Sequence, residues 1–155
     1  MYKCIYSFIL LLPIFVASQE NNLDFHINSK IDVNKQIKIV YDDSNIDLSE
    51  DEQYSQVLST KLLNDLSKKG LKVNFPQDLK NICILKECGK IDIITKDEEF
   101  IFLFISTQSS GGRTTINGLI YQNNKVIGGF KSYRSYWTNN RFDKLSLSIA
   151  DKIVN

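Results

Sequence analysis

The chain has 155 residues, of which 43% are hydrophobic and 24% are charged, and its formal net charge is +1. This length predicts one domain that is large enough to bury a hydrophobic core. The balanced charge excludes a global electrostatic field that would draw the protein to nucleic acid or to an acidic membrane.

Residues 1–18 have the pattern of a secretory signal peptide. Lys3 provides a short basic region, an apolar run extends over residues 5–16, and small residues follow at 16–18. The run is shorter than the roughly 20 residues that a membrane-spanning helix needs, so an uncleaved anchor is the weaker alternative. Cys4 precedes the run and does not fit a lipoprotein acylation site. We expect cleavage after residue 18 and a periplasmic or secreted protein without a stable membrane anchor.

The exported part divides into a polar leader at residues 19–35 and a single domain at 36–155. Within the leader only the run LDFHI, at 23–27, has the composition of a strand, and we expect it at a sheet edge. The domain opens with a β-branched run at 36–43, which predicts a strand that stops at two aspartates.

The clearest predicted helix lies within residues 48–70. Ser49 is expected to cap its start, with Glu52 completing a capping box and acidic residues favouring the first turn. Gly70 marks its end. One apolar stripe, which predicts packing on a sheet, recurs at three- and four-residue steps: Tyr54, Val57, Leu58, Leu62 and Leu66.

The segment after this helix predicts three short elements. Residues 71–75 alternate as a strand that stops at Pro76, residues 76–90 predict a short helix, and residues 91–95 predict another strand. The strand, helix and strand that open the domain therefore have the order of a βαβ unit.

The last third of the chain predicts a meander and a closing helix. Three strand-like runs at 99–107, 114–122 and 125–137 are separated by Gly- and Asn-rich turns. The closing helix has apolar residues at helical steps: Phe142, Leu145, Ile149 and Ile153. We therefore predict an α+β fold, with a mostly antiparallel sheet and the two longer helices on one face.

Two cysteines, Cys83 and Cys88, remain in the exported part. In an oxidising compartment a lone pair of this kind is most simply one disulfide, and their spacing requires a turn or a frayed helix end between them. A redox or metal site is the alternative. Two thiols and the distant His26 offer too few ligands for zinc, so we expect a disulfide, no metal and no cofactor.

The sequence has few candidates for catalysis. His26 is the one histidine and lies in the leader, and the acidic runs at 42–43, 50–52 and 97–99 fit a strand end, a helix start and a turn. No familiar nucleophile, zinc or phosphate-loop motif is present. We predict that the protein is not an enzyme, with a hydrolase acting through a pair of carboxylates as the alternative.

Basic and aromatic residues gather in two stretches near the meander. The stretch at 109–115 predicts a hairpin tip with an exposed arginine, because it lies between two strands and does not open a helix. On a strand over 128–137, alternate residues face opposite sides, with Phe130, Ser132, Arg134 and Tyr136 on one side and Lys131, Tyr133, Ser135 and Trp137 on the other. The solvent-facing set is expected to be Lys131, Tyr133 and Trp137, or else Arg134 and Tyr136. The candidate contact residues are Arg113, Lys131, Tyr133, Arg134, Tyr136 and Trp137.

Two interpretations of these residues stay open. They form a contact surface for glycan or protein, or they are the amphipathic aromatics of an ordinary half-buried strand, which is the favoured interpretation. Export excludes nucleic acid as the expected partner.

The order of elements resembles a group of small envelope proteins of Gram-negative bacteria: the lipopolysaccharide-assembly lipoprotein LptE, the N-terminal domain of TolB and CsgG-like secretion proteins. The residues that carry this resemblance are IKIVYDD, LSKKG with LKVNF, and KVIGGFKSYRSYW with LSLSIADKIV, over about residues 36–154. The resemblance implies a role in the cell envelope. Many of those proteins are lipoproteins, whereas no lipobox cysteine directly follows the apolar run here.

The sequence thus predicts a small exported non-catalytic protein that binds or supports an envelope partner, either another protein or a glycan. The alternatives are a periplasmic immunity or inhibitor protein against a toxic enzyme, and a secreted glycan hydrolase. Exposed strands at the sheet edges also predict a weak homodimer.

Overall fold

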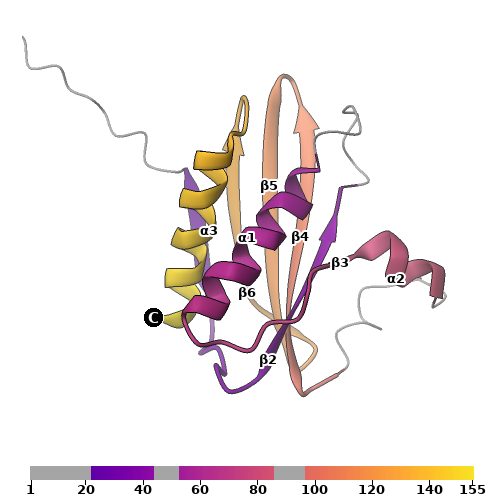
Figure 1. Cartoon of the computed structure of the whole chain (residues 1–155), viewed down its shortest axis with the longest axis vertical. Helices are drawn as coiled ribbons and strands as arrows, with labels where there is room; N and C mark the ends of the chain where they lie inside the picture. Colours follow the sequence, from indigo (N-terminus) through magenta and orange to yellow (C-terminus); the bar gives the residue numbers. More distant parts are fainter. Residues whose placement is uncertain (1–21, 44–52, 86–96) are drawn as a thin grey trace, which may run out of the picture.

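The computed structural model describes residues 22–43, 53–85 and 97–155. The predicted signal peptide, the strand expected at 91–95 and Cys88 lie outside these ranges, so these predictions are not addressed by the structure. Figure 1 shows a sheet with two helices lying side by side across one face and a third, short helix beyond the sheet edge. Among the described residues, no helix combines the length and the apolar character that crossing a bilayer requires.

The sheet has six strands in the order β1-β6-β5-β4-β2-β3. Strands β1, β6, β5 and β4 pair antiparallel, whereas β4, β2 and β3 pair parallel. This mixed sheet confirms the predicted α+β class. The strands are β1 (Leu23–Ile27), β2 (Gln36–Asp42), β3 (Gln77–Asp78), β4 (Phe100–Ser110), β5 (Arg113–Gln122) and β6 (Lys125–Arg134).

Strand β1 confirms the edge strand that was expected within the polar leader. It pairs antiparallel with β6, so that Phe25 lies opposite Phe130 and Asp24 lies opposite Lys131. The sheet therefore includes part of the leader, because the LDFHI run buries one face of alternating residues against the core.

The predicted meander is confirmed by two tight hairpins. Gly111 and Gly112 have φ of 58° and 74°, and Asn123 and Asn124 have φ of 52° and 58°. Positive φ at both central residues is what a two-residue type I′ turn needs, and Gly and Asn adopt it at the lowest cost. These turns place β4, β5 and β6 side by side.

The βαβ unit is present, but its returning strand is shorter than predicted. Only Val73 of the 71–75 run forms a bridge with β2, opposite Ile37, and the parallel ladder resumes at β3. Pro76 has no N–H to donate, so the ladder is interrupted before β3. Helix α2 (Leu79–Leu85) consequently begins after β3 and not at Pro76.

Helix α1 (Tyr54–Lys68) begins later than predicted. Its N-cap is Gln53, which makes no side-chain cap, and its first turn contains no acid, so the prediction that Ser49 caps the helix was wrong. The carboxylate of Asp43, at the end of β2, instead accepts the backbone N–H of Ser55 at 2.9 Å and of Gln56 at 3.1 Å. The residue that directly follows β2 therefore stabilises the helix start.

The core lies between the sheet and helices α1 and α3 (Asn139–Val154). The predicted stripe of α3 is buried, and that of α1 is buried at its three leucines and partly buried at Tyr54 and Val57, which confirms the packing of both helices on one face. The helices are also joined to each other by Ser146, which donates to Asp65 at 2.7 Å, and by the pairs Lys61–Asp143 and Lys69–Asp151, each at 2.5 Å. Side chains without solvent contact include Leu58, Leu62, Leu66, Ile105, Ile116, Leu145 and Ile149.

One glycine of the sheet makes room for an aromatic ring. A Cβ at Gly118 in β5 would lie 2.0 Å from Cε1 of Phe130, the residue opposite it on β6. Phe130 is only 3% exposed, so its ring lies across the glycine under the helices. The close approach explains why β5 carries no side chain at this position.

Candidate functional site

All three arginines of the chain lie at the start of β5, the end of β6 or the start of α3. These three element ends lie toward the same end of the sheet, the upper end in Figure 1. Arg113 follows the β4–β5 turn, and Arg134 ends β6 directly opposite Thr114. Arg141 lies in the first turn of α3, which begins at Asn139. The antiparallel meander and the return of the chain into α3 therefore place three positions that are separated along the sequence at one end of the sheet, with Arg113 and Arg134 on opposite faces by register.

Arg141 holds an exposed tyrosine in place. Its guanidinium lies 4.1 Å from the ring centroid of Tyr136 and donates to the backbone oxygen of Tyr136 at 2.8 Å and to its hydroxyl at 3.2 Å. The ring remains 60% exposed. Since the guanidinium both stacks and forms hydrogen bonds, the pair presents an aromatic ring and a positive charge to solvent in a fixed arrangement.

Trp137 is buried next to this end of the sheet. Only 8% of it is exposed, its ring stacks on Phe142 with centroids 5.1 Å apart, and its Nε1 donates to the backbone oxygen of Thr114 at 3.3 Å. The alternation predicted to place Trp137 beside Lys131 and Tyr133 stops short of it, because β6 ends at Arg134. The structure therefore places Trp137 in the core, which corrects its assignment to a solvent-facing set.

Within β6 the alternation is as predicted. Phe130 and Ser132 are buried under the helices, whereas Lys131 and Tyr133 are exposed on the opposite face of the sheet. Tyr133 is 45% exposed, and Arg134 is partly buried. One face of the strand is thus covered and the other is in contact with solvent.

The structure brings together four of the six candidate contact residues and adds a fifth. Arg141 was missed because nothing in the local pattern shows that the first turn of α3 brings it onto Tyr136, in the segment after β6. The signal that could have found it is the tyrosine five residues earlier, on the other side of the Thr138 cap. We name this surface the arginine–tyrosine end, defined by Arg113, Tyr133, Arg134, Tyr136 and Arg141. Lys131 and Tyr133 share the helix-free face of β6, but Lys131 lies two residues farther from the end of the strand and is not included.

The other residues singled out in the sequence are His26, the acidic runs and the two cysteines. His26 is exposed in β1, and Asp97 accepts the N–H of Glu99 at 3.3 Å while pairing with Lys38 at 3.5 Å. Within the described ranges no three His, Cys, Asp or Glu side chains come together as metal ligands. Cys83 lies in α2 and Cys88 lies outside the described residues, so their disulfide stays a prediction.

Comparison with known proteins finds a shared fold and no family. No family model and no curated protein matches the sequence. Two solved structures of the PelC dodecamer from Paraburkholderia phytofirmans, one of them a single-residue variant, match with a TM-score of 0.50 and 10% identity. The match covers 86% of this chain and 95% or 94% of the PelC chain. At this identity the likeness concerns the fold alone, and the resemblance to LptE, TolB and CsgG-like proteins stays a prediction.

Proposed function

We propose that this chain is an exported, non-catalytic protein of the cell envelope that binds an acidic glycan through its arginine–tyrosine end. The observation that carries the proposal is that all three arginines and two exposed tyrosines lie at one end of the sheet, where Arg141 contacts Tyr136. The signal-peptide pattern at residues 1–18 supports export.

The chemistry of these side chains fits an acidic sugar polymer. A guanidinium presents a planar set of donors that matches a carboxylate in two parallel hydrogen bonds. An exposed tyrosine ring offers an apolar face and a polar tip, which suits the mixed faces of a sugar ring. Tyr136 is already fixed by Arg141, so binding at its ring requires little loss of side-chain entropy.

The PelC fold adds support for self-association. PelC assembles as a dodecamer, and an assembly of this chain would present many copies of the arginine–tyrosine end to one polymer, which raises the apparent affinity without a new contact. The sheet edges are β1 and β3, and β1, with five residues, is the longer one for pairing with a second copy.

The test uses immobilised polygalacturonate, a polymer of acidic sugars, with dextran as the neutral comparison. The double variant Arg113→Ser/Tyr136→Ala is expected to bind polygalacturonate at least about tenfold more weakly, because it loses a charge-assisted contact and a stacking ring. Lys125→Ser is the matched control, since Lys125 is exposed at the opposite end of β6. We expect its affinity to stay within about twofold of the original protein.

Three results would count against the proposal. Equal weakening in Lys125→Ser would mean that binding follows total charge and not this surface. Equal binding to dextran would exclude a role for the arginines. Binding to polyglutamate in place of polygalacturonate, with the same dependence on Arg113, would assign the surface to an acidic protein instead.

A further inference from the structure

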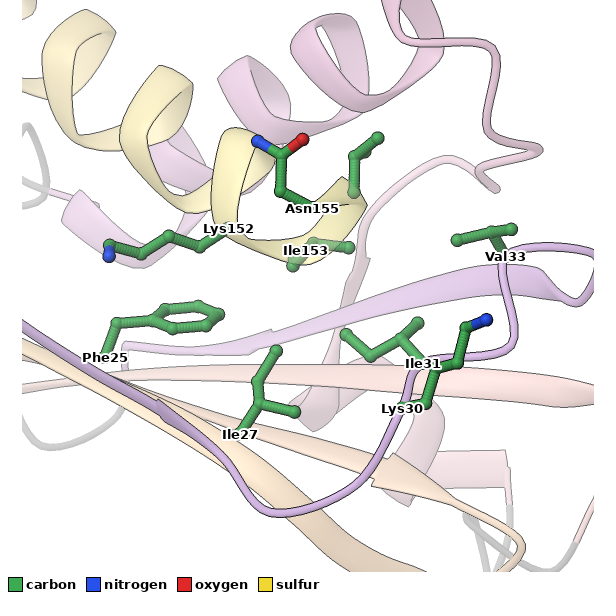
Figure 2. Close-up of a pocket in the computed structure, with 9 residues that line it drawn as sticks. Phe25, Ile27, Lys30, Ile31, Val33, Lys152, Ile153 and Asn155 are labelled. Atoms are coloured by element: carbon green, nitrogen blue, oxygen red, sulfur yellow. The ribbon is translucent and has the colours of Figure 1, made fainter.

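A pocket lies at the other end of α3 from the arginine–tyrosine end. Figure 2 shows Phe25 and Ile27 rising from β1, the segment after β1 on a second side, and the last turn of α3 across from them. Helix α3 has 16 residues, so its two ends are about 24 Å apart at 1.5 Å per residue. The pocket is therefore independent of the surface proposed above.

The floor of the pocket is apolar. Ile31 and Ile153 are 5% and 6% exposed and close its base, while Val33 and Val154 are 44% and 38% exposed at its rim. Its volume is about 600 Å³. This volume falls within the roughly 300–1,000 Å³ that is usual for small-molecule sites. The surface thus offers an apolar site that is large enough for a small ligand.

Two lysines give the pocket its charge. Lys30 and Lys152 line it, both are exposed, and the described residues that line it include no acid. Lys152 has its Nζ 5.7 Å from the ring centroid of Phe25, at the edge of the apolar floor. Within the described part of the chain neither lysine forms an ion pair. Two positive charges therefore face a ligand that enters over an apolar base.

We infer that this pocket binds a monomeric single-chain amphiphile with an anionic head, such as a fatty acid. The hydrocarbon chain lies along Phe25, Ile27 and Ile31, where its burial removes apolar surface from water. The carboxylate stays at one side of the pocket, beside Lys152 or Lys30, which lie at opposite sides in Figure 2, and it remains partly hydrated there. The charge of the lysines selects the anionic head, and the recessed apolar floor selects one chain in preference to a membrane surface.

The first experiment measures affinity for a series of fatty acids by calorimetry, each below its micellar concentration. Octanoate, decanoate and dodecanoate are expected to bind with rising affinity, about fourfold for each methylene that enters the pocket. Dodecanol is expected to bind at least about tenfold more weakly than dodecanoate, because it lacks the charge. Absence of saturable dodecanoate binding, or affinity independent of chain length, would overturn the inference.

The second experiment locates the site. Val33→Trp fills the mouth from an exposed position and is expected to abolish dodecanoate binding, and Val154→Trp provides a second blocking variant if the first does not fold. The double variant Lys30→Glu/Lys152→Glu is expected to weaken dodecanoate at least about tenfold, whereas Lys144→Glu, an exposed lysine of α3 outside the pocket, leaves it unchanged. Unchanged binding in both blocking variants would contradict the site. Binding to phosphatidylglycerol vesicles without binding to dodecanoate would show a membrane-surface contact and overturn the proposal.

Discussion

Under α1 and α3 the sheet is lined by side chains that have lost all contact with solvent, such as Ile105 and Leu145. At the arginine–tyrosine end, β5, β6 and the segment after β6 present charged and aromatic groups to water, with Tyr136 60% exposed. The first region is apolar and closely packed, whereas the second is polar and open. The residues that stabilise the fold and the residues available for binding therefore lie at different places along one sheet.

Trp137 lies where the two regions meet. Substitutions at Trp137 and at its exposed neighbour therefore test the difference between the regions most strongly. Trp137→Ala is expected to lower the free energy of unfolding by about 3–5 kcal/mol, because it leaves a cavity beside Phe142 and removes the bond to Thr114. Its neighbour Tyr136→Ala is expected to cost less than about 1 kcal/mol, as an exposed position. Urea denaturation followed by far-UV circular dichroism measures both, since Trp137 is the one tryptophan. An equal loss of free energy of unfolding in both variants would contradict the assignment of Trp137 to the core and Tyr136 to the surface.

Gly118 tests how closely the helix-covered region is packed. Gly118→Ala is expected to cost about 1–3 kcal/mol, because the new methyl group meets the Phe130 ring and the ring has little room to move. The cost is expected to fall in a Phe130→Leu background, which a double-mutant cycle would measure by denaturation. Gly111→Ala is the control. It is strained by its positive φ but has open space around it, so it is expected to show no coupling to Phe130→Leu. No coupling at Gly118 would contradict the packing described.

Asp43 tests whether a long-range cap holds the start of α1. Asp43→Ala is expected to cost about 1 kcal/mol, because the N–H groups of Ser55 and Gln56 lose their acceptor. Asp43→Asn retains one acceptor oxygen and is expected to cost less. Thermal denaturation of the two variants measures the difference. If the asparagine and alanine variants were both as stable as the original protein, the helix start would depend on another group.

Tyr41, two residues before Asp43, gives the smallest effect and the one that depends on pH. Burial, together with the charges of Asp78 and Asp43, raises the pKa of the Tyr41 phenol above its ordinary value of 10.0. The folded state then holds the phenol proton more tightly than the unfolded state does. Its contribution is fully present below pH 10 and is lost as the pH rises through the folded pKa. Tyr41→Phe is expected to flatten this alkaline decline in urea stability, and an unchanged slope would show that other groups cause it.

The regions also differ in how far the sequence predicts them. The stripes of α1 and α3 depend on residues three or four positions apart, and the meander depends on adjacent Gly and Asn pairs, so local patterns predicted both. The cap of α1 was predicted wrongly because Asp43 reaches the helix from the preceding strand. Only the folded chain shows that β6 ends before Trp137 or that Arg141 lies beside Tyr136. Hydrophobic periodicity therefore could not predict contacts between residues that only the chain topology brings together.

The most direct test of the central claim is a titration of the ¹⁵N-labelled protein with galacturonate oligosaccharides, followed by ¹H–¹⁵N correlation spectra. We expect the amide signals of Arg113, Tyr133, Arg134 and Arg141 to shift and to saturate together. The amide of Lys125, at the opposite end of β6, is expected to stay in place. Shifts centred on the pocket at the last turn of α3, or no saturable shifts at all, would contradict a glycan-binding role for the arginine–tyrosine end.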